Sequence, residues 1–129
     1  MNGNEVLVDT SVWVALFSKD PRVAGLADRV GARTVVASAL TLAELQSLSA
    51  QGRLRLEAAK DVLATARIEV LGPETALEGG RLHGQLRSRG RTKAGLVDAL
   101  ILATSLRVGA HLLTLDHDLA GEPGVEVLG

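Results

Sequence analysis

Short apolar runs alternate with longer stretches of helical periodicity along the chain. Residues 5–9 form a compact apolar run with polar flanks, which is typical of a buried strand. Residues 10–18 follow with apolar side chains spaced four apart, which predicts a helix. The same patterns predict strands at 34–37, 68–71, 111–115 and 125–128, and helices at 21–30, 41–50, 54–66, 74–88 and 94–108. Gly79 and Gly80 can interrupt the helix at 74–88.

Strands that are apolar on both faces and joined by helices indicate a parallel sheet covered on both sides. The elements therefore predict an α/β protein, built as a three-layer α/β/α domain with a short, mostly parallel sheet. Because the sequence contains no repeat, linker or low-complexity segment, we expect residues 1–129 to form one domain. Ligand sites in such sheets lie beyond the carboxyl ends of the strands, where Asp9 and Asp116 are expected.

Composition narrows the possible functions. The net charge is −1, so binding to a polyanion must rest on a local basic patch. The absence of cysteine excludes disulfides, thiolate zinc sites and cysteine nucleophiles. One Trp and one Phe are the only aromatic residues, which nearly excludes an aromatic platform for stacking RNA bases. No apolar run reaches the roughly 18 residues of a membrane span, and the polar N-terminus shows no signal-peptide pattern, so we expect a cytoplasmic location.

Asp98 is the acid that stands out first. It is the only charged residue from Ala94 to Ala103, within a predicted helix that is apolar on all sides. An ionised carboxylate buried there costs several kcal/mol unless it is paired or bound to a metal. The alternative is an acid at the start of the helix, which the helix dipole favours by only about 0.3–1 kcal/mol.

Three further acids complete a possible site. Asp9 and Asp116 each follow a predicted strand, and each can also be the N-cap of the helix or turn that comes next. Glu44 lies four residues from Leu40 and from Leu48, on a partly apolar stripe, although a solvated glutamate fits the same pattern. A doubly wound sheet can bring all four acids to one edge, where like charges cannot all ionise without compensation. Carboxylate oxygens select a hard cation such as Mg²⁺ or Mn²⁺, which can activate water to attack a phosphodiester.

Four segments carry a resemblance to a known family. They are VLVDTS at 6–11, TLAEL at 41–45, VDALILA at 97–103 and LTLD at 113–116. In this order and spacing they resemble the PIN domain family, and in particular the VapC toxins of toxin–antitoxin pairs. The resemblance implies a parallel sheet with helices on both faces and a Mg²⁺- or Mn²⁺-dependent ribonuclease. It also implies that Asp9, Glu44 and Asp98 are carboxylates of a metal site, with Asp116 as a fourth and more variable member.

The resemblance also implies supporting residues and partners. Thr10 or Ser11 would be a supporting hydroxyl beside the first acid, and Thr114 would orient the fourth carboxylate. Asp118 is a second candidate for that fourth position, and the sequence leaves the choice between Asp116 and Asp118 open. RNA is the implied substrate, and a cognate VapB-type antitoxin, whose tail enters the groove, is the implied partner. A homodimer is also expected from the resemblance.

Basic residues gather in one stretch, because no acid occurs between Glu78 and Asp98. They can form a phosphate grip that leads into the site, or a solvated helix end and loop. The basic side chains in question are Arg81, Arg87, Arg89, Arg91 and Lys93, of which the last four are the predicted nucleic-acid contacts.

Histidines are the alternative catalytic groups for a ribonuclease, as general acid and base. Nothing in the spacing of His83, His111 and His117 sets two of them across one substrate. His117 lies between Asp116 and Asp118 and could bind a transition metal, but a surface histidine fits the position equally well.

Other functions need residues that this sequence lacks. An aspartyl phosphatase would need a second Asp where Ser11 stands, and a receiver domain would need paired acids after the first strand. A nucleotide-binding fold would need a glycine-rich phosphate loop, which the sequence lacks. A non-catalytic binding module would have no reason to keep four costly carboxylates. A PIN nuclease that processes RNA outside a toxin–antitoxin pair remains an alternative.

Overall fold

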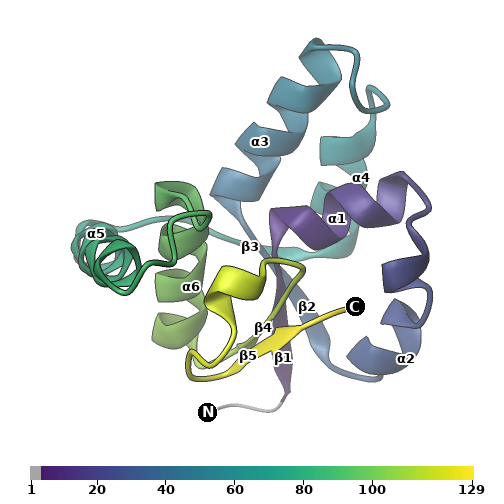
Figure 1. The fold of residues 1–129 in the computed structure, drawn as a ribbon. Coiled ribbons are helices and arrows are strands. Elements are labelled where there is room, and N and C mark those ends of the chain that lie inside the picture. The colour runs from purple at the N-terminus through teal and green to yellow at the C-terminus, as the bar shows by residue number, and fades with distance from the viewer. Residues whose placement is uncertain (1–3) are drawn as a thin grey trace.

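A computed structural model describes residues 4–129 and contains a five-stranded sheet (Figure 1). The strand order is β3-β2-β1-β4-β5, and all four neighbouring pairs are parallel, which confirms the predicted α/β class. Residues 1–3, on which the signal-peptide expectation partly rests, lie outside the described residues. The strands are β1 (Glu5–Val8), β2 (Thr34–Ser38), β3 (Arg67–Glu69), β4 (His111–Thr114) and β5 (Val125–Val127).

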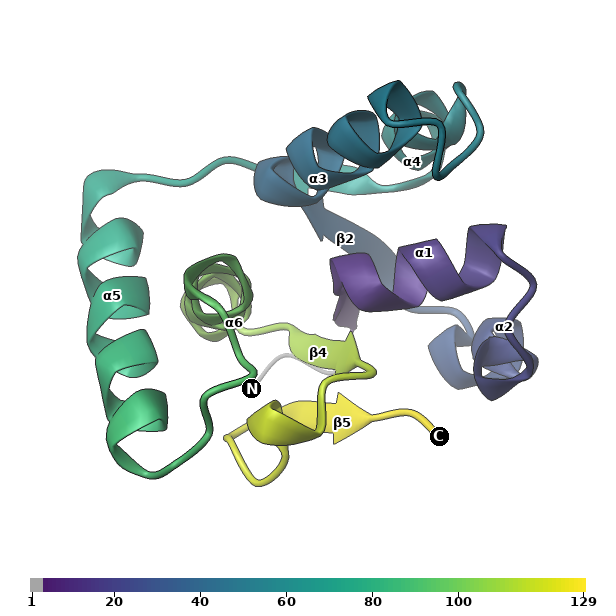
Figure 2. The same cartoon turned by 45° about the horizontal axis from the view of Figure 1, so that its top comes forward.

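Helices cover both faces of the sheet, in three layers as predicted. Figure 2 shows α5 and α6 on one side of the sheet and α1 to α4 on the other. None of the helices between residues 4 and 129 is long and apolar enough to cross a membrane. The α-helices are α1 (Thr10–Phe17), α2 (Leu26–Val30), α3 (Ala39–Ala50), α4 (Ala58–Thr65), α5 (Pro73–Ser88) and α6 (Leu96–Val108), and the two 3₁₀ turns are η1 (Pro21–Val23) and η2 (His117–Leu119).

The central strand β1 is buried on both faces. Leu7 belongs to the apolar cluster beneath α5 and α6, where it lies in register with Val36 of β2 and Leu112 of β4. Val8 faces the opposite way, into the cluster beneath α1, α3 and α4. A strand enclosed on both sides has no solvent-facing position for a polar side chain. The first acid therefore follows at its carboxyl end, as Asp9.

Four predicted helix boundaries are wrong by two residues or more, one of them the start of α3, which is Ala39 and not residue 41. The single helix expected at 21–30 is divided into η1 and α2, with Gly25 as the N-cap of α2. The helix expected from residue 54 begins at Ala58, and the carbonyl of Arg55 before it accepts a hydrogen bond from Ser49 Oγ of α3 (2.8 Å). The helix expected from residue 94 begins at Leu96, which moves Asp98 into its first turn.

The glycine pair at 79 and 80 does not interrupt α5, which continues from Pro73 to Ser88. Gly79 is buried against α6, where an added Cβ would lie 2.4 Å from Leu100 Cδ2 and 3.0 Å from Leu100 Cα. The cost of a helical glycine, about 0.5–1 kcal/mol relative to alanine, is offset here by close packing of the two helices.

This close approach predicts opposite effects at neighbouring positions. Gly79→Ala should destabilise the protein by about 1–3 kcal/mol, because the new methyl group overlaps the backbone of α6. Gly80→Ala is the matched control, since a Cβ there meets nothing within 4 Å, and it should stabilise by about 0.5–1 kcal/mol. Urea unfolding of the two variants measures the difference; equal effects would show that the α5–α6 spacing is not set by Gly79.

Candidate active site

Asp9 lies between the end of β1 and the start of α1, and it is only 1% exposed. It is the N-cap of α1, accepting from the Thr10 backbone N–H at 2.8 Å. Its other oxygen, Oδ2, accepts from Thr114 Oγ1 at 2.7 Å and from Ser11 Oγ at 3.1 Å. Burial raises the pKa of Asp9 to about 6, with repulsion from Asp98 adding to the effect and the Thr114 hydrogen bond opposing it. Asp9 therefore caps α1 and also lies where the acidic site was predicted.

Glu44 is half-buried on α3 and faces α1. Its Oε1 accepts from Thr10 Oγ1 at 2.6 Å, and the same hydroxyl lies 2.9 Å from Thr41 Oγ1. Burial, followed by the charge of Asp98, raises the pKa of Glu44, while the hydrogen bond from Thr10 lowers it. Glu44 is thus held in place by a hydrogen bond, unlike a freely solvated glutamate.

Asp98 is less buried than its apolar surroundings predict. It occupies the third position of α6, where its Oδ2 accepts from the Gly95 backbone N–H at 2.8 Å. The helix-start alternative is therefore observed, and the side chain is half-buried at the end of the helix rather than enclosed within it. Desolvation is the main cause that raises the pKa of Asp98, and repulsion from Asp116 adds to it.

Asp116 and Asp118 have different surroundings. Asp116 Oδ1 accepts from the Asp118 backbone N–H at 2.9 Å, and the Asp116 backbone N–H donates to Thr114 Oγ1 at 3.0 Å. Thr114 therefore contacts Asp116 only through the backbone, and its hydroxyl orients the first acid, Asp9, rather than the fourth. The Asp118 carboxylate points to the α5–α6 loop, where it accepts from the backbone N–H groups of Lys93 (2.7 Å) and Ala94 (3.3 Å).

The four predicted acids come together around one cavity of about 410 Å³, at the carboxyl ends of β1 and β4. Asp118 does not line this cavity, so the geometry favours Asp116 as its fourth acid. None of the three histidines lines it. The lining residues are Asp9, Thr10, Ser11, Val14, Arg22, Glu44, Asp98, Leu115 and Asp116.

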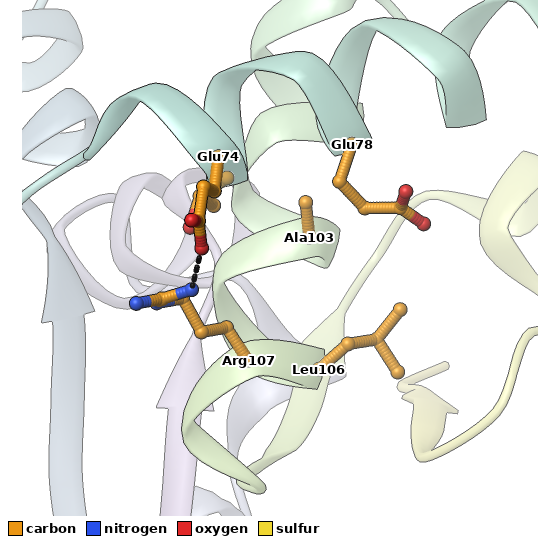
Figure 3. Close-up of a pocket in the computed structure, with 6 residues that line it drawn as sticks. Glu74, Glu78, Ala103, Leu106 and Arg107 are labelled. Carbon is orange, nitrogen blue, oxygen red and sulfur yellow. Dashed lines mark hydrogen bonds and ion pairs between the residues drawn. The ribbon is translucent and has the colours of Figure 1, made fainter.

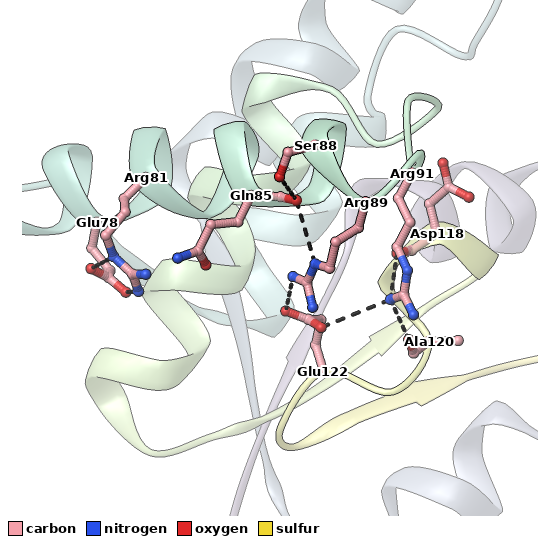
Figure 4. Close-up of polar contacts among 9 residues, drawn as sticks. All are labelled: Glu78, Arg81, Gln85, Ser88, Arg89, Arg91, Asp118, Ala120 and Glu122. Carbon is pink, nitrogen blue, oxygen red and sulfur yellow. Dashed lines mark hydrogen bonds and ion pairs between the residues drawn. The ribbon is translucent and has the colours of Figure 1, made fainter.

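The basic stretch on α5 and its following loop does not line the cavity, and the nucleic-acid contacts predicted at Arg87, Arg89, Arg91 and Lys93 stay a prediction. Figure 4 shows Arg89 and Arg91 directed toward Glu122, at 3.5 and 3.8 Å. Arg81 pairs with Glu78 on the same helix. Arg87 and Lys93 are exposed to solvent.

Arg22 is the cation that lines the acidic cavity, and no motif in the sequence marks it. Its guanidinium pairs with Asp20, with Nη2 to Oδ2 at 2.8 Å, and its side chain is 53% exposed. Asp20 also accepts from the Arg22 backbone N–H at 2.9 Å, as the N-cap of η1. The only signal in the sequence was this capping pattern ahead of Pro21, which says nothing about the acids.

The donor set fits a hard divalent cation. Among residues 4–129, no group of three or more acidic or histidine side chains is placed so that it could hold a metal ion together. Mg²⁺ does not require such a group, because it keeps several waters and binds through one or two carboxylates. Asp9, Glu44 and Asp98 all have raised pKa values caused by burial and a neighbouring negative charge. A cation would relieve this repulsion.

A second cavity of about 300 Å³, between α5 and α6, provides a contrast (Figure 3). It also contains two carboxylates, but each has an arginine: Glu74 lies 3.2 Å from Arg107, and Glu78 accepts from Arg81. The hydrogen bond from Arg81 holds the pKa of Glu78 below its ordinary value, the opposite of the shifts in the acidic cavity. Carboxylates that are already neutralised in this way need no metal.

Comparison with known proteins agrees with this arrangement. Residues 6–121 match the family model of the PIN domain. The chain belongs to the PIN domain family. Its match begins in β1 and extends beyond η2, so it includes all four acids of the cavity.

Solved structures show the same PIN fold. A chain of a toxin–antitoxin complex from Klebsiella pneumoniae is 27% identical, with a TM-score of 0.75 over 95% of this chain and 96% of that one. VapBC2 from Rickettsia felis, bound to a promoter DNA fragment, is 20% identical, with a TM-score of 0.74 over 97% and 99%. VapC20 from Mycobacterium tuberculosis, a toxin that cleaves the sarcin–ricin loop, is 22% identical, with a TM-score of 0.69 over 96% and 99%.

The raised pKa of Asp9 predicts how the metal-free protein responds to pH. Because the folded pKa is about 6 and the ordinary value is 3.8, the folded state binds more protons than the unfolded chain between these values. The free energy of unfolding in EDTA should therefore rise as the pH falls from 7 to 5, by about 1.3 kcal/mol, and the full shift of about 3 kcal/mol is reached only below the ordinary pKa of 3.8. Asp9→Asn should flatten this slope. Urea titrations at several pH values measure it, and a stability that falls toward pH 5 would contradict the prediction.

Proposed function

We propose that this protein is a Mg²⁺- or Mn²⁺-dependent endoribonuclease and the toxin of a VapBC-type toxin–antitoxin pair. The observation that carries the proposal is the convergence of four carboxylates on one cavity without a neutralising cation of their own. They come from four separated positions in the chain, at Asp9, Glu44, Asp98 and Asp116. Arg22, the cation among the lining residues, is paired with Asp20 instead.

Asp9, Asp98, Asp116 and Glu44 would hold the divalent ion. When bound, the ion supplies Lewis-acid stabilisation of the phosphoryl oxygens and activates water for attack on phosphorus. The hydroxyls of Thr114 and Ser11 fix the orientation of Asp9, and Thr10 fixes that of Glu44. Because Thr10 donates to Oε1 of Glu44, the other oxygen, Oε2, can accept the proton released by the attacking water.

RNA as substrate and an antitoxin as partner are supported by the relatives. One structure with this fold is a toxin that cleaves an RNA loop, and several others are toxin–antitoxin assemblies. The acidic cavity also suits a basic side chain from an antitoxin tail, by charge complementarity. A homodimer remains part of the proposal on the strength of the family resemblance.

Cleavage of structured RNA by wild type and Asp98→Asn, in Mg²⁺, in Mn²⁺ and in EDTA, tests the proposal. Wild type should cleave with either ion and lose activity in EDTA, and Asp98→Asn should fall to the level of the EDTA sample. Mn²⁺ should raise the melting temperature of the wild type. In EDTA, Asp98→Asn should be the more stable of the two proteins, because it removes repulsion with Asp116.

Two outcomes would contradict this function. Cleavage that persists in EDTA would assign the chemistry to other groups, with the histidines as the first candidates. Cleavage and Mn²⁺ response that both survive Asp98→Asn would show that the carboxylates around the cavity are not the active site.

Arg22 is expected to contact a substrate phosphate at the rim of the cavity, by exchanging Asp20 for RNA. Arg22→Ala should raise KM with little change in kcat, and it should reduce the slope of log affinity against log salt by about 1. Arg29→Ala is the matched control, because Arg29 is similarly exposed and pairs with Glu126 away from the acids. Steady-state kinetics and RNA binding at several salt concentrations measure both; equal behaviour of the two variants would rule out a specific role for Arg22.

A further inference from the structure

Asp118 joins two parts of the chain that carry different acids of the cavity. Its Oδ2 accepts from two consecutive backbone N–H groups of the α5–α6 loop, those of Lys93 and Ala94. The next N–H in that loop, from Gly95, donates to Asp98 Oδ2 at 2.8 Å. The consecutive backbone N–H groups of residues 93–95 are therefore held by two acids, Asp118 of the C-terminal segment and Asp98 of the first turn of α6.

Arg91 strengthens the same junction from the loop side (Figure 4). Its Nη1 donates to the carbonyl of Ala120 at 2.6 Å and to that of Asp118 at 3.2 Å. Glu122 lies 3.8 Å from the same nitrogen and is shielded, with only 11% of its side chain exposed. The backbone N–H of Arg91 donates to the carbonyl of Leu86, which fixes the loop to the end of α5.

These contacts form a continuous path between two carboxylates of the proposed metal site. Asp116 Oδ1 accepts from the Asp118 N–H, Asp118 Oδ2 accepts from the α5–α6 loop, and the loop donates to Asp98. Asp98 and Asp116 are like charges that line the same cavity, so their repulsion opposes a fixed spacing between the two segments that carry them. The backbone hydrogen bonds to Asp118, and those from the Arg91 guanidinium to carbonyl groups, supply a restraint without neutralising either acid.

We propose that Asp118 and Arg91 are positioning residues that fix the separation of the Asp98 and Asp116 carboxylates. The inference rests on the proposed function and deepens it. Asp118 acts as a hydrogen-bond acceptor rather than as a metal ligand, and Arg91 acts on carbonyl groups rather than on a substrate phosphate. Both roles differ from those that the sequence suggested for these side chains.

The test compares Asp118→Ala, Asp118→Asn, Arg91→Ala and wild type. Asp118→Ala and Arg91→Ala should weaken Mn²⁺ binding at least about tenfold, because they release the support of two ligands. Asp118→Asn should bind Mn²⁺ almost as wild type does, since a single side-chain oxygen receives both loop N–H groups and an amide oxygen can replace it. Calorimetric Mn²⁺ titration measures the affinity, and RNA cleavage at limiting and saturating Mn²⁺ should show the same order.

Two control variants separate positioning from loss of stability. Arg81→Ala removes an exposed arginine of α5 that pairs only with Glu78, so it should leave Mn²⁺ affinity unchanged. Val62→Ala opens the core on the opposite face of the sheet, so it should lower the melting temperature without changing Mn²⁺ affinity. Circular dichroism in EDTA establishes that each variant is folded at the titration temperature, and Arg91→Ala serves the test where Asp118→Ala does not fold.

Unchanged Mn²⁺ affinity in Arg91→Ala and in folded Asp118→Ala would overturn the inference while leaving the proposed function intact. Equal weakening in Asp118→Asn and Asp118→Ala would overturn it as well, because the charge of Asp118 would then be what matters. A wild type that neither binds Mn²⁺ nor cleaves RNA would overturn the proposed function, and the inference with it.

Discussion

The hydrogen bond from Thr114 to Asp9 joins the carboxyl ends of the two adjacent strands β1 and β4. The Thr114 hydroxyl is fully buried and also accepts from the Asp116 backbone, so one side chain relates two acids of the cavity. Thr10 connects Asp9 and Glu44 in a similar way. Its backbone N–H donates to Asp9, and its hydroxyl donates to Glu44. Uncharged donors orient these carboxylates and leave their negative charge available for a cation, whereas arginines would have cancelled it.

This arrangement lowers the stability of the metal-free protein at neutral pH, because it keeps desolvated like charges together. The rest of the fold offsets that cost through two apolar clusters, one on each face of the sheet. The acids lie where both clusters end, at the carboxyl edge of the strands. The buried carboxylates break the usual rules of side-chain placement at this edge, which is expected of a functional site.

Much of the fold was predictable, because strands buried on both faces leave a continuous apolar run such as the one that precedes Asp9. The convergence of the four acids was predictable from strand ends and family motifs. The burial of each acid was not predictable. Asp98 stands among apolar residues in the sequence, yet it lies at a helix end. Asp9 has the sequence pattern of a simple N-cap, yet it is only 1% exposed. Periodicity describes one helix at a time, whereas burial depends on what packs over its end. For the same reason, the pairing of Arg91 with the Glu122 segment could not be seen in the sequence.

The buried position of Asp9 also has a consequence for the lifetime of the protein in a cell. A ligand that binds only the folded state increases its stability in proportion to the logarithm of ligand concentration. If divalent ions fill the acidic cavity, the fraction of molecules that open and become accessible to proteases should therefore rise when those ions are scarce. The carboxylates that we assign to catalysis would then also link the turnover of this chain to the supply of the ion that it uses.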